Sequence, residues 1–243
     1  KALGKADRAE HYKATYKKVR DHFRTLYCDE NGELNPENRT QCGYLLALRI
    51  GLLDEDKRPA AVAALKQKII DNGYKLSTGF VGTCILNEVL AEFGENNLAY
   101  SLLLQTENPS WLYSVDQGAT TIWERWDSYT IEKGIGKGGM NSFNHYAYGC
   151  VCEWIWESAA GISSVIEQTG FKHISMAPIP DRRLGYIKAE YNSVAGLIKC
   201  AWRYEGEKWI WEFTIPEGAK ATVTLPGESE SKEYGAGAYT VTK

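Results

Sequence analysis

A chain of 243 residues, of which 44% are hydrophobic and 12% aromatic, is long and apolar enough to fold around a packed core, which excludes a disordered protein. The formal net charge of −3 and the lack of a long run of like charges argue against binding to nucleic acid or to an anionic membrane surface, because both require a basic face. The same charge balance fits a small, neutral or polar ligand better. No segment approaches the ~18 apolar residues of a membrane span.

The chain starts at Lys1, and Met140 and Met176 are its only methionines, so we expect it to begin inside a larger protein. The chain leaves three cellular locations open, namely cytoplasm, periplasm and secretion. The six cysteines have neither CxxC spacing nor the density of a disulfide scaffold, and we expect buried free thiols and no metal site. They are Cys28, Cys42, Cys84, Cys150, Cys152 and Cys200.

The first two-thirds of the chain has the periodicity of helices. Four apolar residues after Asp7 repeat at spacings of four, three and four, which predicts one buried helical face: Tyr12, Tyr16, Val19 and Phe23. Thr40 is a candidate N-cap for a helix running through Leu48 and Ile50.

Further helices are expected along the same part of the chain. Lys57 to Ile70 should form one that is closed by Asn72-Gly73, and a second should end at Gly94. Their inward positions are Val62, Leu65 and Ile69 in the first helix and Leu86, Val89, Leu90 and Phe93 in the second. A helix from Asn97 to about Gln105 should stop before Asn108-Pro109, and a last one should contain Tyr148, Val151 and Ile155. Short connections between helices of similar length predict antiparallel hairpins, arranged in a closed or partly closed ring.

After Gly161 the period changes from helical to alternating, which indicates antiparallel strands. Turn signals at Glu205-Gly206 and Glu217-Gly218 separate these strands. The alternating residues predict four of them: Ile187, Ala189 and Tyr191; Ile198, Cys200, Trp202 and Tyr204; Trp209, Trp211, Phe213 and Ile215; Val223 and Leu225. The tail is therefore expected to be a small β-sandwich or half-sandwich packed on the helical part.

The segment "GATTIWERWD", residues 118–127, places a glutamate and an arginine between two tryptophans. Trp123 and Trp126 could fill a core while Glu124 and Arg125 form a satisfied polar pair. Alternatively, the indoles stack on a sugar ring and the carboxylate of Glu124 acts on it as an acid, a base or a nucleophile.

Two other segments are candidates for a site. "NSFNHYAYG", residues 141–149, contains His145, which is compatible with either a structural histidine or a ligand contact. The glycine-rich stretch before it, residues 134–139, lacks the strand and the Lys-Ser/Thr order of a nucleotide motif. "STGFVGT", residues 77–83, offers free N–H groups at a helix start, although a tight turn explains it equally well.

Several segments, in this order and spacing, resemble the bacterial α-L-rhamnosidases of the inverting type. They are "TGFVGT", "WLYSVDQGATTIWERWDS", "SFNHYAYGCVCEWIWESAAGI" and "YNSVAGLIKCAWRYEGEKWIWEFTIPEGAKATVTLPG". The resemblance runs along essentially the whole chain. It implies a mainly α fold with a β tail, in which part of an (α/α)6-type barrel of helical hairpins over residues 1–161 precedes a small antiparallel β-sandwich over residues 162–243.

The resemblance also implies roles for individual residues. Glu124 matches the general base of the family and His145 matches a histidine that contacts the rhamnose, while Trp123 and Trp126 match aromatic positions of the motif and are expected to bind substrate. The implied reaction is hydrolysis of terminal α-L-rhamnosides with inversion. Water and two carboxyl groups suffice for it, so no metal or organic cofactor is implied.

One motif of the family has no counterpart here. The general acid belongs to an upstream segment reading roughly "RDERLGWTGD", and "PDRRLGY" at residues 180–186 lacks its glutamate and lies at the entrance to the β tail. We therefore expect a fragment with about half a barrel that is inactive alone. Its expected partners are a rhamnose-containing glycoside or polysaccharide, the N-terminal remainder of the enzyme and, in a homo-oligomer, further copies of itself. The alternatives are another (α/α)6 glycosidase and a non-catalytic carbohydrate-binding module.

Overall fold

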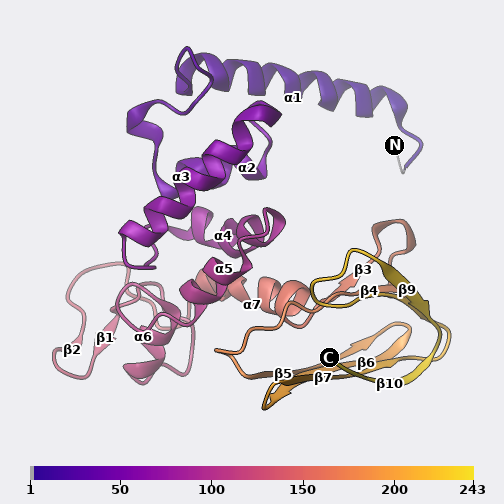
Figure 1. Ribbon diagram of the computed structural model, residues 1–243. Helices are drawn as coiled ribbons and strands as arrows, with labels where there is room; N and C mark the ends of the chain where they lie inside the picture. The colour runs from indigo at the N-terminus through magenta and orange to yellow at the C-terminus, as the bar shows by residue number, and fades with distance from the viewer. Residues whose placement is uncertain (1–2) are drawn as a thin grey trace.

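The computed structural model describes residues 3–243 and has two parts, a helical region (residues 6–159) and a β-region (residues 162–242), shown in Figure 1. The helical region contains α1 (Ala6–Tyr27), α2 (Gln41–Arg49), α3 (Arg58–Asp71), α4 (Phe80–Glu92), α5 (Asn96–Leu103), α6 (Trp111–Asp116) and α7 (Val151–Trp154). The 3-10 turn η3 (Tyr146–Cys150) precedes α7, and the π-helical turn η4 (Ile155–Ala159) follows it. Within residues 3–243, no helix is both long and apolar enough to cross a membrane.

Local signals explain where these helices begin and end. The Thr40 side chain accepts a hydrogen bond from the Gly43 amide at 2.9 Å and caps α2, as predicted. Gly73 and Gly94 adopt positive φ angles of 68° and 79° directly after α3 and α4, where the chain leaves the helix. The short helix α6 and the two-residue strands β1 (Tyr129–Thr130) and β2 (Gly134–Ile135) were not predicted.

The core of the helical region is built around α4. Leu86, Val89 and Leu90 are almost completely buried, and they belong to one apolar cluster with residues of α2, α3, α5 and α7. Phe93 is partly buried against the same cluster. The helical hairpins therefore share a single core, as their periodicity predicted.

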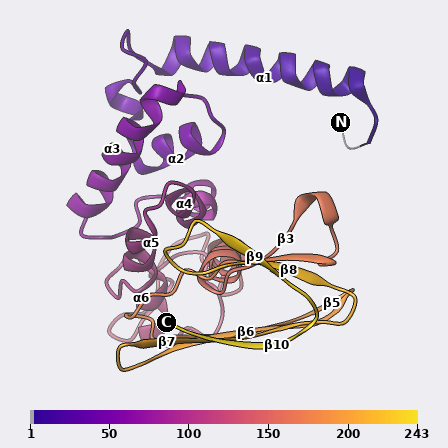
Figure 2. The same ribbon diagram turned by 45° about the vertical axis from the view of Figure 1, so that its right-hand side comes forward.

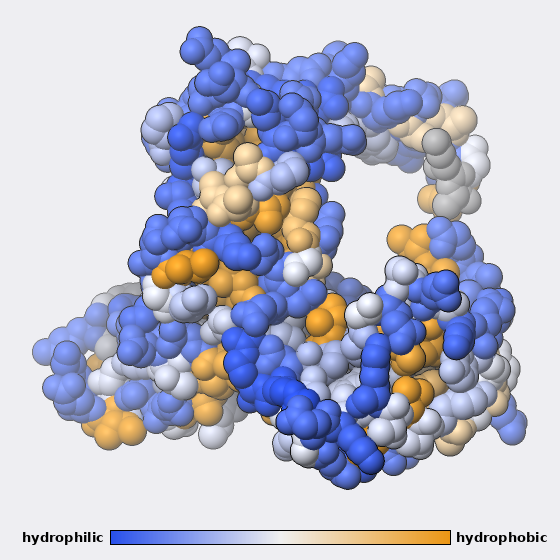
Figure 3. Space-filling model, in the orientation of Figure 1, coloured by the Kyte–Doolittle hydropathy of each residue, from blue (hydrophilic) through white to orange (hydrophobic). Residues whose placement is uncertain are grey.

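The helix α1 is an exception to this packing. It was correctly predicted as a helix, but the expectation of a buried face was wrong, because α1 has no buried residue and Tyr12 is 62% exposed. Only its C-terminal part touches the core, through Phe23. The Tyr16 hydroxyl also donates to the Gly51 carbonyl at 2.8 Å. In Figures 1 and 2 the N-terminal end of α1 extends away from the molecule, and Figure 3 shows open space between it and the β-region.

The β-region is a sandwich of two four-stranded sheets with a common core. One sheet has the order β10-β7-β6-β5 and the other β3-β4-β8-β9, and all neighbours are antiparallel except β4 and β8, which are parallel. The strands are β3 (Ile162–Ser164), β4 (His173–Met176), β5 (Tyr186–Ser193), β6 (Gly196–Glu205), β7 (Lys208–Ile215), β8 (Lys220–Thr224), β9 (Ser231–Tyr234) and β10 (Gly237–Thr242).

The four predicted strands correspond to β5 to β8, and the four shorter or more polar strands escaped prediction. Gly206, with a φ of 59°, forms the tight turn between β6 and β7, as expected from Glu205-Gly206. The turn at Glu217-Gly218 instead carries the chain from one sheet to the other, because β7 and β8 do not pair.

Several hydrogen bonds join the two regions, among them one from the Ile179 amide to the Ser158 carbonyl at 3.0 Å. The indole N–H of Trp202 donates to the carbonyl of Ala159 at 2.8 Å, and the Tyr100 hydroxyl donates to the carbonyl of Ile179 at 2.6 Å. Arg183 binds Ser101 and the carbonyl of Asn97 on α5, while its guanidinium pairs with Asp181 at 2.6 Å. The "PDRRLGY" segment therefore has a structural role in attaching the β-region to α5.

All six cysteines are free thiols. The expectation that they are buried holds only for Cys200, whose pKa is raised to about 11 by burial. Cys152 is exposed and the other four are half-buried.

Candidate active site

The segment that carries Glu124 is paired with the segment that carries His145. The amide of His145 donates to the carbonyl of Ile122 at 2.9 Å, and the amide of Glu124 donates to the carbonyl of Ser142, also at 2.9 Å. Because Ile122 pairs with His145 and Glu124 pairs with Ser142, the two segments run alongside each other in opposite directions. Residues 21 positions apart in the sequence are thus brought to one place.

A further hydrogen bond positions the Glu124 side chain. The amide of Ser142 donates to Glu124 Oε2 at 2.9 Å, which holds the carboxylate over the neighbouring segment. Within residues 3–243, the structure shows no hydrogen bond to the other oxygen, Oε1, and the side chain is half-buried. One carboxylate oxygen is therefore held by the backbone while the other stays available to a water or a ligand.

His145 is held by aromatic rings. Its imidazole stacks on Phe80, the first residue of α4, with ring centroids 4.6 Å apart and an interplanar angle of 22°. The ring of the next residue, Tyr146, is nearly parallel to the imidazole, with ring centroids 6.0 Å apart and an interplanar angle of 7°. The glycine-punctuated "TGFVGT" segment, which was ambiguous in the sequence, thus contributes a wall of the site through Phe80.

Several helices of the core begin at this end of the helical region. The side chain of Gln41, the first residue of α2, bonds the Ser77 amide and the Lys75 carbonyl just before α4. His145 directly precedes η3 and stacks on the first residue of α4. The N-terminal ends of α2, α4 and the η3–α7 unit therefore gather on one side, next to Glu124.

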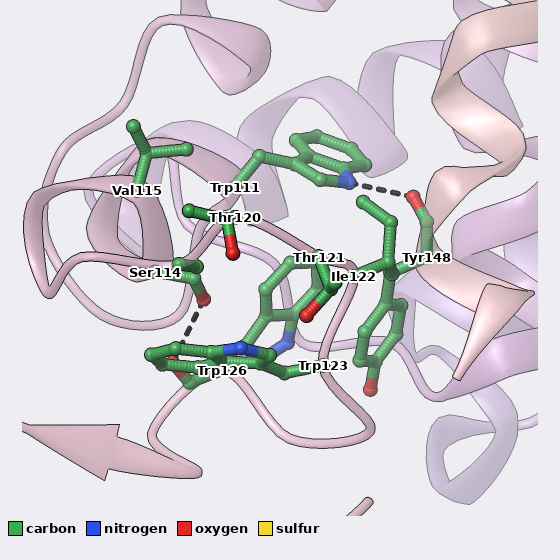
Figure 4. A pocket seen from close by; sticks show the side chains of 10 residues that line it. Trp111, Ser114, Val115, Thr120, Thr121, Ile122, Trp123, Trp126 and Tyr148 are labelled. Carbon is green, nitrogen blue, oxygen red and sulfur yellow. Dashed lines mark hydrogen bonds between the residues drawn. The ribbon is translucent and has the colours of Figure 1, made fainter. Parts of the chain in front are cut away.

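Trp126 lies in a cluster of large aromatic side chains. Its indole stacks on Tyr148 with centroids 3.9 Å apart at 18°, and it meets Trp111 edge to face at 5.6 Å. The indole N–H of Trp111 donates to the Tyr148 carbonyl at 2.8 Å, and Ser114 Oγ donates to the Trp126 carbonyl at 2.8 Å. Figure 4 shows these side chains around a cavity of about 320 Å³ that is also lined by Trp123.

Trp123 is more enclosed than Trp126. It is 7% exposed and meets Tyr129 and Phe143 edge to face, at 6.4 Å and 5.5 Å. These contacts are typical of a packing residue that also forms part of a cavity wall. Neither Glu124 nor His145 lines that cavity. The four predicted site residues therefore form two adjoining groups, Trp123 with Trp126 at the cavity and Glu124 with His145 beside it.

The charged neighbours of Glu124 do not include Arg125, although the sequence allowed a polar pair between the two. Arg125 does not pair with Glu124; its guanidinium contacts Asp127 at 3.2 Å near the surface. Burial raises the pKa of Tyr148, and the nearby Cys150 thiol and Glu124 carboxylate raise it further. Tyr148 is therefore a neutral ring at physiological pH, placed between Trp126 and Phe80.

The sequence predicted Glu124, His145, Trp123 and Trp126 as site residues, but it did not single out the residues that contact them. These are Phe80, Trp111, Ser142 and Tyr148. All four lie inside the quoted motifs and three of them are aromatic, which is the only signal that pointed to them. In the part of the chain that is described, no group of three or more His, Cys, Asp or Glu side chains is arranged to hold a metal ion.

Residues 1–159 match the bacterial alpha-L-rhamnosidase 6 hairpin glycosidase domain, and residues 161–239 match the bacterial alpha-L-rhamnosidase C-terminal domain. An alpha-L-rhamnosidase of Formosa agariphila is 41% identical over 227 residues, which are 93% of this chain and 24% of that protein. One from an Alteromonas species is 35% identical over 224 residues, 92% of this chain and 24% of that protein. The chain thus spans about a quarter of the length of the curated relatives it matches.

Solved structures show the same similarity. The native rhamnosidase of Aspergillus terreus has a TM-score of 0.92 at 34% identity, covering 99% of this chain and 28% of that chain. The Streptomyces avermitilis alpha-L-rhamnosidase complexed with L-rhamnose has a TM-score of 0.87 at 32% identity, covering 97% of this chain and 24% of that one. With both family matches in sequence and the same fold in the solved relatives, this chain belongs to the bacterial α-L-rhamnosidase family.

Proposed function

We propose that this chain supplies the general base of an inverting α-L-rhamnosidase, with Glu124 activating the water that attacks the anomeric carbon of a terminal α-L-rhamnoside. The observation that carries the proposal is the pairing of the Glu124 and His145 segments, with one carboxylate oxygen held by the Ser142 amide. A base needs this combination of a defined orientation and a free lone pair. The solved relative named as complexed with L-rhamnose supports the choice of sugar.

In this proposal His145 contacts the rhamnose, and its ring is oriented by stacking on Phe80. Trp126 contributes to substrate binding through the cavity beside Glu124, while Trp123 supports that wall. In this proposal the site belongs to residues 1–161, the expected part of the catalytic domain. Residues 162–243 form the expected C-terminal β-domain. The substrate is a rhamnose-containing glycoside or polysaccharide.

An inverting mechanism requires a second carboxyl group ~6.5–9.5 Å from the first, so that a water fits between the base and the sugar. We propose that this acid lies on a part of the enzyme outside this chain, since the acid motif of the family has no counterpart in the 243 residues. The chain alone should therefore not hydrolyse an aryl α-L-rhamnoside, and adding the N-terminal portion of a complete enzyme should restore turnover.

The test is Glu124→Gln in a complete enzyme that contains this chain. We expect kcat to fall by ~10² to 10⁴, the usual effect of losing a general base, with a smaller change in substrate affinity. Glu132→Gln, an exposed glutamate in the β1–β2 hairpin, is the matched control and should leave kcat unchanged. Proton NMR of the first-formed sugar should show the inverted anomer. Unchanged turnover in Glu124→Gln would remove the base role and favour a carbohydrate-binding module.

A further inference from the structure

The backbone of Glu124 is held on both sides. The peptide group before it is fixed by Ser142, because the Glu124 amide donates to the Ser142 carbonyl at 2.9 Å. The peptide group after it is fixed by Ser128, because the Arg125 amide donates to Ser128 Oγ at 3.3 Å. The same hydroxyl donates to the Arg125 carbonyl at 3.0 Å, and Ser128 is completely buried. A turn over residues 125–128 therefore fixes the chain directly after the proposed base.

The side chain of Asn141 joins this turn to the segment that holds Glu124. Its Nδ2 donates to the Ser128 carbonyl at 3.2 Å and to the Gly136 carbonyl at 3.3 Å. Asn141 directly precedes Ser142, whose amide donates to Glu124 Oε2 at 2.9 Å. Two consecutive residues thus hold the carboxylate and the turn that follows it, one through its backbone and the other through its side chain.

Gly136, the residue after β2, leaves room for this arrangement. Its amide donates to the Ser128 carbonyl at 2.8 Å, so this oxygen accepts two hydrogen bonds. A Cβ at position 136 would lie 3.3 Å from the same oxygen and 3.6 Å from Asn141 Nδ2, and the first distance is tighter than an ordinary van der Waals contact. The hairpin of β1 and β2, visible at the edge of the helical region in Figure 1, is therefore closed against the turn after Glu124.

The hydrogen bonding of Asn141 separates its role from simple stabilisation. Its Oδ1 is buried and has no hydrogen-bond partner within residues 3–243. A buried acceptor without a partner costs free energy, which offsets much of what the two Nδ2 bonds contribute. Both of these bonds are also longer than the ~2.9–3.0 Å that is most common for N–H···O bonds. The net contribution of Asn141 to folding is therefore small, whereas its donors fix the relative position of three segments.

The position of these segments matters for a general base. A displacement of ~1 Å at a reacting group can lower the rate by ~10²-fold. Residues 137–140, which lead to Asn141, are all exposed, and among them Gly138 has a φ of 130° and Met140 a φ of 56°. Asn141 stands between this exposed loop and Ser142. Movement of the loop reaches the Glu124 carboxylate only through the residue that Asn141 anchors.

From these contacts we infer that Asn141 is a positioning residue of the proposed reaction, which orients the Glu124 carboxylate by clamping the turn of residues 125–128 to Ser142. Asn141 acts through Ser128 and Ser142 and not on the sugar. The inference rests on the proposed function for its link to catalysis, whereas the effect on the carboxylate can be measured without turnover.

The kinetic test is Asn141→Ala in a complete enzyme that contains this chain. We expect kcat to fall by about 10- to 100-fold and KM to change by less than about threefold, because the base is displaced while the sugar contacts remain. Asn35→Ala is the matched control. It removes a bond of the same kind, from Asn35 Nδ2 to the Leu26 carbonyl at 3.1 Å near the end of α1, and should leave kcat unchanged.

A second variant covers the case in which Asn141→Ala does not fold. Gly136→Ala keeps Asn141 but places a Cβ against the Ser128 carbonyl, so it should loosen the same clamp and lower kcat by about 3- to 10-fold. Thermal unfolding of the 243-residue chain accompanies both variants. For Asn141→Ala the Tm should change by less than about 4 °C, because the residue contributes little net stability.

A double-mutant cycle separates positioning from a merely structural role. If Asn141 acts through Glu124, Asn141→Ala should change kcat by less than about twofold in a Glu124→Gln background. A structural role would instead lower the kcat of the double variant by the full factor seen for Asn141→Ala alone.

The orientation of the carboxylate is measured by NMR on the ¹⁵N-labelled 243-residue chain. The amide signal of Ser142 reports its hydrogen bond to Glu124, so it should shift as acid protonates that carboxylate. Glu124→Gln should abolish this titration and thereby identify its source. Asn141→Ala should reduce its amplitude by roughly half or more, because a hydrogen bond weakens steeply when its geometry is lost. Asn35→Ala should leave it unchanged.

Three results would overturn the inference: unchanged kcat in both Asn141→Ala and Gly136→Ala, independent effects in the double-mutant cycle, or an unchanged Ser142 titration in Asn141→Ala. Failure of the proposed function has a different signature, which is unchanged turnover in Glu124→Gln alone. In that case the Ser142 titration still decides whether Asn141 orients the carboxylate.

Discussion

The β-region and the helical region of this chain differ in how completely they bury their own apolar surface. In the β-region both sheets contribute to one core, and the large side chains Trp202, Trp211 and Phe213 are at most 2% exposed. In the helical region α2 to α7 share a core in the same way, but α1 leaves Tyr12, Val19 and Leu26 in solvent. A sandwich closes between two sheets, whereas a helix at the edge of an array has a neighbour on one side only.

The difference shows what an apolar stripe with helical spacing indicates. It marks a helix face that favours a packing neighbour, but it does not show that such a neighbour is present. The stripe on α1 has the spacing of a buried face, as do the stripes on α3 and α4 that are buried here. Leu86 and Phe93 have neighbours because α4 lies at the centre of the array, whereas α1 lies at its edge. Exposed apolar side chains in a row are typical of an interaction surface.

The largest effect is expected from Trp202→Ala. The indole is 1% exposed in the β-region core, and its N–H is bound to the Ala159 carbonyl of the helical region. Removing it should lower the free energy of unfolding by about 3–5 kcal/mol, measured by urea denaturation. Trp202→Phe keeps an aromatic ring and should lower the free energy of unfolding by less. A loss below about 1 kcal/mol for the alanine variant would contradict the closed-core description of the β-region.

A smaller effect, with a defined pH dependence, is expected at the joint between the regions. The hydrogen bonds from Arg183 hold the pKa of the Asp181 carboxyl below its ordinary value. Because the folded-state pKa is lowered, the stabilisation is present above the ordinary carboxyl pKa of ~3.9 and disappears as the pH falls through the lowered value.

Asp181→Asn should therefore reduce stability at pH 7 by about 1 kcal/mol, a modest figure because Arg183 is 41% exposed although Asp181 is only 14% exposed. The difference from the unsubstituted chain should vanish once the pH has fallen below the lowered pKa of Asp181, as followed by thermal unfolding across pH. Asp21→Asn, which affects an exposed pair with Arg20 on α1, is the control and should change little at any pH. A difference that persists in acid would rule out the ion pair as its cause.

The smallest effect on folding is expected from Tyr12→Ala on α1. Since this side chain lies in solvent, the free energy of unfolding should change by less than about 0.5 kcal/mol. Leu86→Ala in the centre of the same region should cost about 2–5 kcal/mol. Sizing chromatography completes the comparison, because the chain should self-associate through the α1 surface and Tyr12→Ala should reduce that association. A large destabilisation by Tyr12→Ala at low protein concentration would show that α1 is covered within the monomer.

Local patterns in the sequence determined most of the elements of this protein. The helices α1 to α5 and the strands β5 to β8 could be predicted because their signals are local. These signals are the spacing of apolar side chains, the Thr40 cap and the glycines after helices, and each depends on residues a few positions apart. The strand β9 escaped because its residues are polar and mostly exposed. The strand β10 escaped because only two residues, Tyr239 and Val241, mark its alternation. The parallel pairing of β4 with β8 escaped because it joins segments about 47 residues apart.

The candidate site divides in the same way. The residues of "TTIWERW" and "SFNHYAYG", through their resemblance to the family, predicted Glu124, His145, Trp123 and Trp126 as site residues. Only the tertiary structure decided that the Ser142 amide holds Glu124, that Phe80 stacks on His145, and that Trp111 and Tyr148 enclose a cavity with Trp126. Those relations depend on contacts between segments that are distant in the chain, and no local pattern records how far apart such segments lie after folding.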